Sequence, residues 1–139
     1  MDFLLDVERM LLGMVGGAAI FMVAGVRPHL PKEGGLALPG AIWARFNLFA
    51  FAAVTLTMVL AAVRLGDGHD RALVHVVGGA VLLAVVFVKS RFDTRVASRE
   101  TDAGPEGPDW DAVKRDMSRI IPLTAVTQIL SIGLALAPA

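Results

Sequence analysis

The sequence predicts an all-α protein of the membrane, a bundle of four transmembrane helices with a short amphipathic lead-in to the fourth. The composition is unusually apolar, with 55% apolar residues and a mean hydropathy of +0.65, against about 45–50% apolar residues in soluble domains. These residues fall into four continuous blocks, and nearly all of the charge falls between them. A bilayer-spanning helix needs roughly 20 mostly apolar residues, whereas a membrane strand alternates over about 10 residues. The blocks therefore predict helices.

The four blocks belong to one transmembrane domain and place the spans at approximately 6–26, 43–64, 71–90 and 118–137. The chain opens with an acidic stretch, whereas a secretory signal peptide opens with a basic one. We therefore expect the first block to be retained as a helix. The connection after the second span is short and rich in glycine, which predicts that the second and third helices are antiparallel neighbours.

The third connection, about Lys89 to Arg119, is predicted to contain a mobile cytoplasmic linker at 96–109. Its middle is acidic and rich in proline and glycine, so it buries too little apolar surface to offset the entropy of ordering. Asp109 is the expected N-cap of the fourth helix. Trp110, Val113 and Met117 then recur at helical spacing with basic residues between them, which predicts an amphipathic stretch at the headgroups.

Lysine and arginine predict the orientation. One side of the membrane receives ten of them: Arg27, Lys32, Arg45, Lys89, Arg91, Arg95, Arg99, Lys114, Arg115 and Arg119. The other side receives three, Arg9, Arg64 and Arg71. Because cytoplasmic loops carry the excess of positive charge, we expect both termini outside. Trp43, Trp110 and Arg45 would then anchor the cytoplasmic interface.

Small residues mark the expected helix contacts, because close backbone approach replaces the hydrophobic drive that lipid does not supply. Gly13 and Gly17 form a G-x-x-x-G motif in the first span, and Gly78 and Gly79 lie in the third. They indicate either a contact between these two helices, which we favour, or a dimer face. Gln128, on the fourth span, is expected to bond another helix, with the lining of a pathway as the alternative.

Glu8 and His75 are the ionisable pair expected near the outer surface, one on the first helix and one on the third. Ionisable residues within spans indicate function unless water reaches them, and the wet, structural interpretation is the one we favour. If the chain handles a proton or a metal ion, it would do so here. Met10 and Met14 would line the next turns inward, and their thioethers would favour Cu(I).

Two resemblances add to this interpretation. In Gly16-Gly17, in Trp43-Ala-Arg-Phe-Asn47 and in the charged stretch 110–118, the chain looks like the bacterial four-helix membrane proteins around the copper resistance D family. That resemblance implies copper handling in a bacterial inner membrane. Arg45-Phe-Asn47 also resembles the arginine–asparagine motif of the membrane-associated eicosanoid and glutathione metabolism family, which implies a glutathione-dependent enzyme.

Three function classes follow, in order of preference. The first is an interaction or accessory subunit of the membrane, the second a small transporter or metal-handling protein, and the third a glutathione-dependent membrane enzyme. The formal net charge of zero gives no reason to expect a nucleic-acid partner. The sequence shows no nucleotide loop and no zinc-type spacing. We therefore expect a protein without catalytic activity, whose partners are the bilayer and either a second copy or another membrane subunit.

Overall fold

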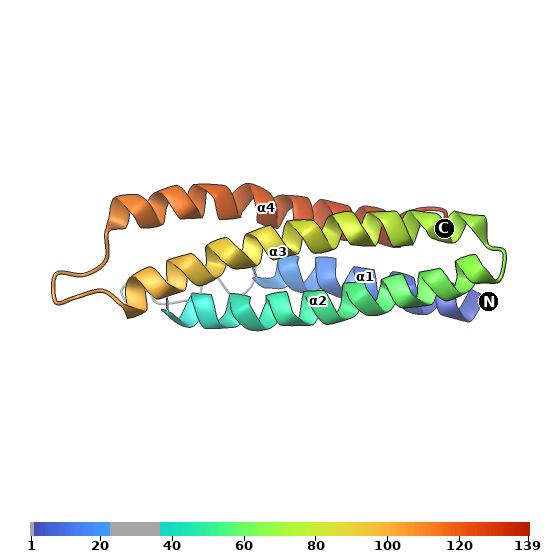
Figure 1. Cartoon of the computed structure of the whole chain (residues 1–139), viewed down its shortest axis with the longest axis horizontal. Helices are drawn as coiled ribbons and strands as arrows, with labels where there is room; N and C mark the ends of the chain where they lie inside the picture. Colours follow the sequence, from blue (N-terminus) through green and yellow to red (C-terminus); the bar gives the residue numbers. More distant parts are fainter. Residues whose placement is uncertain (1, 23–36) are drawn as a thin grey trace.

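The computed structural model describes residues 2–22 and 37–139, with side chains left undescribed at 37–41 and 100–101. Within these ranges the chain is helical, as predicted, and contains α1 (Asp2–Phe21), α2 (Ala37–Gly66), a 3-10 turn η3 (Asp70–Ala72), α3 (Leu73–Thr101) and α4 (Trp110–Leu136) (Figure 1). The last residues of the expected span 6–26 lie outside the described residues, as do Arg27 and Lys32 of the first connection.

Three of these helices are long and apolar enough to cross a membrane, over Ile42–Gly66, Asp70–Arg99 and Trp110–Leu136. The described part of α1 is shorter and carries Asp2, Asp6, Glu8 and Arg9 in its first half. The second, third and fourth blocks are therefore confirmed as helices with the length and composition of membrane spans.

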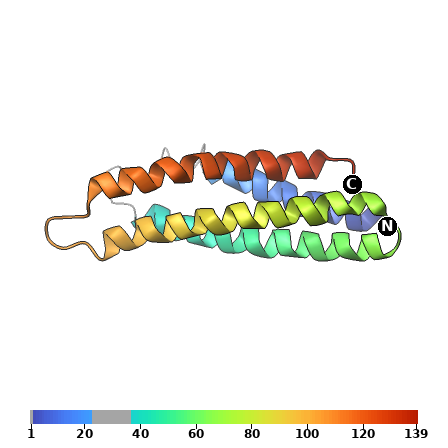
Figure 2. The same cartoon turned by 45° about the horizontal axis from the view of Figure 1, so that its top comes forward.

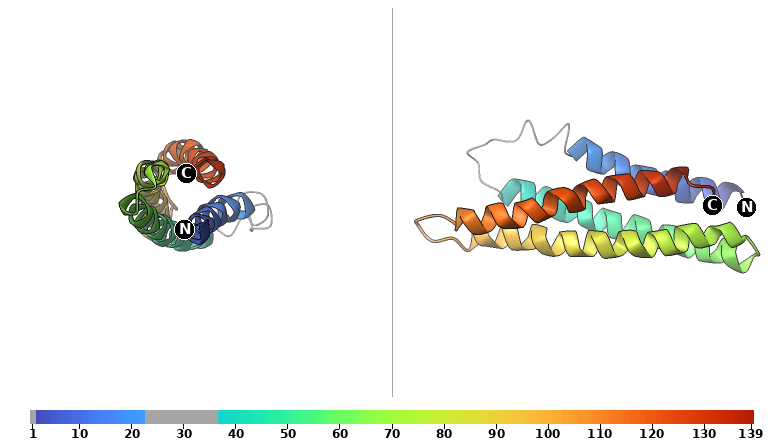
Figure 3. Two further views of the ribbon diagram at one scale, coloured as in Figure 1. Left: turned by 90° about the vertical axis from the view of Figure 1, so that its right-hand side faces the viewer. Right: turned by 90° about the horizontal axis from the view of Figure 1, so that it is seen from above.

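The helices form a ring in which α1 contacts α2 and α4, and α3 contacts the same two helices from the other side. The end-on view shows α1 and α3 on opposite corners (Figure 3). The expectation that α1 and α3 pack directly through small residues is therefore wrong. Both termini and the α2–α3 turn lie at one end of the bundle, the termini end. The loop between α3 and α4 lies at the other, the linker end (Figures 1 and 2).

The connections are built by local hydrogen bonds. Gly68, at φ +88°, takes the left-handed conformation that closes the tight α2–α3 turn, and the predicted antiparallel pairing of these helices is confirmed. Asp109 caps α4 as predicted, because its side chain accepts from the backbone N–H groups of Asp111 and Ala112. The linker is shorter than expected. Residues 96–101 continue α3, and within this stretch Val96 packs against Val113 and Arg99 pairs with Asp116 at the start of α4. The mobility of the remaining linker stays a prediction.

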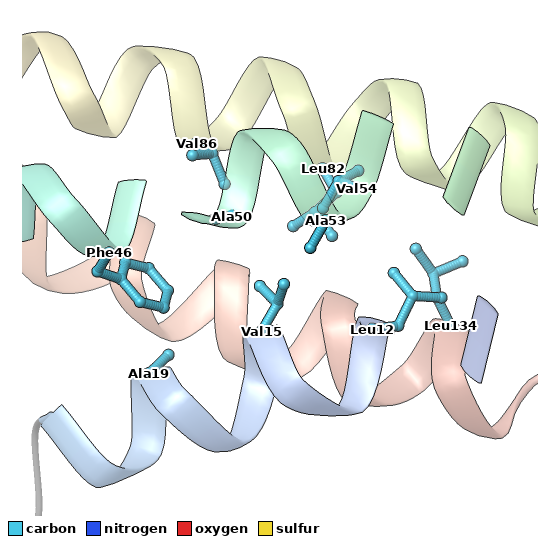
Figure 4. Packing of buried hydrophobic residues seen from close by; sticks show 10 residues of the cluster. All are labelled: Leu12, Val15, Ala19, Phe46, Ala50, Ala53, Val54, Leu82, Val86 and Leu134. Carbon is cyan, nitrogen blue, oxygen red and sulfur yellow. The ribbon is translucent and has the colours of Figure 1, made fainter. Parts of the chain in front are cut away.

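The bundle is apolar outside and partly polar inside. Large apolar side chains such as Leu48 and Ile129 are more than 70% exposed, while Glu8, Lys89 and His75 are fully buried. A narrow apolar core fills the centre (Figure 4) and consists of Leu12, Val15, Ala19, Phe46, Ala50, Ala53, Val54, Leu82, Val86 and Leu134. Soluble proteins rarely bury unpaired charge or expose contiguous apolar surface, so this distribution is typical of a chain solvated by lipid.

Glycine permits the helix contacts, although not at the positions expected in α1. A Cβ on Gly16 would lie 2.7 Å from Cγ1 of Ile132 on α4, whereas Gly13 and Gly17 have no neighbour within 4 Å. On α3, a Cβ on Gly79 would lie 2.6 Å from Cγ of Met58 on α2, and one on Gly78 would overlap Leu134 on α4. The rotation of α1 turns the G-x-x-x-G pair outward, so it takes no part in packing against the described residues of the other helices.

Gly16→Leu is expected to destabilise the bundle by about 1–3 kcal/mol or more, because the new side chain must push α4 away. Gly17→Leu, one residue further, meets open space and is expected to change stability by less than about 0.5 kcal/mol. Thermal unfolding of both variants in detergent measures the difference. Equal loss of stability at the two positions would contradict the helix rotation described here.

Candidate functional site

A buried carboxylate joins all four helices near the termini end. Glu8 on α1 is fully buried, and its Oε2 accepts a 2.9 Å hydrogen bond from Nη1 of Arg64 on α2. The same oxygen lies 2.5 Å from Nδ1 of His75 on α3. Nε2 of His75 lies 2.8 Å from the backbone oxygen of Leu134 on α4. We refer to Glu8, Arg64 and His75 as the Glu8 cluster.

Arginines extend the Glu8 cluster to the residues that follow α4. Nη2 of Arg64 donates to the backbone oxygen of Ala139 at 3.0 Å, and Nη2 of Arg9 donates to that of Ala137 at 3.2 Å. Carbonyls beyond the end of a helix have no partner within that helix, so the arginines supply hydrogen bonds that the helix cannot. The C-terminal segment is therefore held by side chains of α1, α2 and α3.

The two ring nitrogens of His75 both face oxygen atoms. A neutral imidazole has one N–H and one lone pair. If Nε2 donates to Leu134, the Nδ1 lone pair faces Glu8. If Nδ1 donates to Glu8, the Nε2 lone pair faces the carbonyl of Leu134. The two contacts are hydrogen bonds at the same time only when His75 or Glu8 carries an additional proton. The arrangement therefore has room for one proton more than a neutral imidazole beside an ionised carboxylate.

The predicted neighbours Glu8 and His75 are confirmed as a pair, but the methionines do not join them. Met10 and Met14 are 57% and 47% exposed. Met10 follows Glu8 by two residues, which is about 200° around a helix, so it points away from the interior. The expectation that the two methionines line the turns inward from Glu8 is wrong. Among the described residues no group of three or more histidine, aspartate and glutamate side chains converges as a metal site.

A second buried ion pair, the Lys89 cluster, lies toward the linker end. Lys89 is fully buried and donates to Asp93 Oδ2 at 2.6 Å and to Asn47 Oδ1 at 3.2 Å. Asn47 in turn donates to Asp93 Oδ2 at 2.8 Å. The ammonium also lies 3.9 Å from the ring centroid of Trp43, an attractive contact with the face of the ring. Asn47, half of the motif shared with the glutathione family, is thus bonded within the bundle.

The remaining predicted residues do not converge on either cluster. Thr124 and Thr127 donate to the carbonyls four residues earlier in their own helix, so they need no cavity. Gln128 is half-buried and makes no hydrogen bond to the described residues. Trp110 and Arg45 are exposed near the linker end, where interfacial anchors are expected.

Sequence reasoning missed three of the residues that form the clusters. Lys89 and Asp93 were assigned to the third connection, although their spacing of four residues places them on one helix face. Arg64 was counted only as an outer charge. Its depth on α2 resembles that of Glu8 on α1, and a pair of opposite charges one turn inside two spans is the signal that would have identified it.

The two oxygen neighbours of the His75 ring give a spectroscopic prediction. In ¹⁵N NMR of the protein in lipid, the Nδ1 signal of His75 is expected to report a shared or bound proton, whereas exposed His69 serves as an ordinary reference in the same sample. In Glu8→Gln, the amide can donate to a bare Nδ1, so His75 is expected to become a neutral ring that keeps its Nε2 proton. A bare, unbonded Nδ1 in the parent protein would contradict this assignment.

Comparison with known proteins gives no match on which a function could be based. No protein-family model matches the chain, and no curated protein and no solved structure matches it. The resemblances drawn from the sequence therefore stay predictions. The two buried clusters, the apolar core between them and the apolar outer surface are the observations on which a function has to rest.

Proposed function

We propose that the chain is an integral membrane protein that spans the bilayer four times, with α1 as a span in addition to α2, α3 and α4. We further propose that it serves as an interaction or accessory subunit. The first support is the spacing of charge along the helices. Arg71 and Arg91 are separated by 20 residues of α3 and its lead-in, or about 30 Å at 1.5 Å per residue. Arg45 and Arg64 on α2 are separated by about 28 Å. Both distances match the hydrocarbon thickness of roughly 30 Å.

The inclusion of α1 as a span rests on its contacts. α1 packs along both α2 and α4, and its outward face carries Met10, Met14 and Phe21, which are each about half exposed or more. Its acidic Glu8 is paired in the interior, as charge inside a bilayer has to be. The apolar sequence continues past Phe21 to residue 26. An even number of spans places both termini on the same side.

Under the positive-inside rule the linker end faces the cytoplasm and the termini end faces outward. Single cysteines at Gly104 and at Asp67 test this, since the parent chain has no cysteine. In intact cells an impermeant thiol reagent is expected to label Asp67→Cys, and Gly104→Cys only after the membrane is opened. The reverse pattern would contradict the orientation, and labelling of both in intact cells would contradict the four-span topology.

The interaction role is carried by one observation: the interior is packed, whereas an unused small-residue face looks outward. Leu12, Val54 and Leu82, from three different helices, are fully buried in the core between the Glu8 cluster and the Lys89 cluster. A Cβ at Gly13 or Gly17 would instead meet nothing within 4 Å in the part of the chain that the structure describes. Glycines four residues apart on an outward face permit another transmembrane helix to approach closely, so we assign the partner contact to this face of α1.

A photoreactive residue at Ile20, which is 44% exposed and lies one turn beyond Gly17, tests the contact in membranes and leaves both glycines in place. Position 20 is expected to cross-link a discrete partner, either a second copy or another subunit. Gly13→Leu is expected to abolish that product while leaving thermal stability unchanged. Two differently tagged copies of the chain, co-expressed, separate self-association from a different subunit. No discrete product at position 20, or a product insensitive to Gly13→Leu, would remove the proposed interaction role.

A second candidate function is proton handling by the Glu8 cluster, favoured by the two oxygen neighbours of the His75 ring, which accommodate an additional proton. Arg64 on α2 is hydrogen-bonded to Glu8, and Arg9 on α1 donates to the carbonyl of Ala137. A proton flux into liposomes that is lost in Glu8→Gln would favour this candidate. Liposomes that stay impermeable to protons would favour the interaction role, in which the cluster holds the helices together.

A further inference from the structure

Beyond the buried clusters, the linker end carries a group of exposed cations beside apolar side chains. Arg95 on α3 and Arg119 on α4 both lie over the ring of Phe92, with their guanidinium carbons 5.3 and 5.6 Å from its centroid. One turn earlier on α3, Arg91 lies 5.7 Å from the ring centroid of Phe87. Arg95 on α3 and Arg119 on α4 thus share one aromatic ring, and Arg91 lies one turn from Arg95 along α3.

Two acids of these helices are already paired, and Asp102 and Asp109, which line a hollow together with Arg95, form no ion pair with it in the described residues. Asp93 is buried and bonded to Lys89 and Asn47, and Asp116 is buried and paired with Arg99 at 2.9 Å. Within the part of the chain that the structure describes, Arg91, Arg95 and Arg119 have no carboxylate partner within ion-pair distance. Their positive charge is therefore available to an external anion.

The position of the group along the bundle indicates which anion. Arg91 and Arg119 stand at the border of the apolar belt, since Phe87, Val88 and Ile121 next to them are exposed apolar side chains. The charged group of an anion bound here would lie between the arginines. Any acyl chains that it carries would lie against these apolar side chains. A phospholipid with a net negative headgroup combines the two properties, and basic sites between transmembrane helices bind such headgroups.

We propose that Phe92, Arg91, Arg95 and Arg119 form a binding site for the phosphate headgroup of an anionic phospholipid between α3 and α4. The guanidinium groups offer paired N–H donors to phosphate oxygens. Phe92 holds two of them in place before the lipid arrives. The site depends on the bundle lying in a bilayer, but not on the partner contact of α1.

Titration of the purified chain with phosphatidylglycerol, followed by native mass spectrometry, tests the site. Arg95→Gln/Arg119→Gln is expected to bind this lipid at least about tenfold more weakly, and phosphatidylcholine is expected to bind weakly to parent and variant alike. Arg95→Lys/Arg119→Lys keeps the charge and is expected to retain most of the binding. Arg45→Gln is the matched control, because Arg45 is exposed near the same border on α2, and Arg71→Gln is the control at the termini end.

The outcomes separate the alternatives. Equal weakening in Arg45→Gln or Arg71→Gln would show diffuse attraction to the whole chain and overturn the site. Equal binding of phosphatidylcholine, or displacement of the lipid by millimolar inorganic phosphate, would overturn the assignment to an anionic lipid. Unchanged thermal unfolding of the glutamine double variant without lipid shows that it is folded. Labelling of the cysteine variants, carried out separately, reports on the topology without reference to this site.

Discussion

The hydrogen bonds to Glu8 are the constraint on which the bundle depends, because they are the place where all four helices meet. A carboxylate without partners is prohibitively costly inside a low-dielectric interior. Glu8 on α1 obtains its partners from α2 and α3, and His75 passes the connection to the backbone of α4. Apolar packing between lipid-facing helices tolerates rotation and sliding far better than this set of directional contacts does.

The Lys89 cluster plays the corresponding part at a different depth, and it joins only α2 and α3. Between the two clusters the core is built from small and medium side chains, with four alanine or valine positions on α2 and α3 fully buried or nearly so: Ala50, Ala53, Val54 and Val86. Small side chains bring the backbones close together, which strengthens dispersion contacts where no hydrophobic drive exists. Two polar clusters thus determine the register of helices that a featureless apolar core would leave undetermined.

The helical fold could be predicted from the sequence because segregation of apolar and charged residues is a property of whole segments. Helix rotation was harder, because Gly16 and Gly17 are adjacent and differ only by about 100° around the axis. The motif at Gly13 and Gly17 favoured one face, whereas the structure buries the face that carries Glu8, Leu12, Val15 and Ala19. The pairing of Glu8 with His75 was predicted, but from an expected packing of small residues between α1 and α3 that the structure does not show. Side chains reach across the interior from diagonal helices whose backbones do not touch.

The capture of the carbonyls of Leu134 and of the residues after α4 bears on the order in which the chain assembles. Arg9, Arg64 and His75 precede α4 in the sequence, yet their acceptors are the backbone oxygens of Ala137, Ala139 and Leu134. In a bilayer, the first three helices therefore hold donors whose acceptors arrive only with α4 and the residues after it. Insertion of α4 closes the network in one step, so an intermediate with three helices exposes unfilled polar donors and is distinguishable, by a membrane protease or chaperone, from the finished bundle.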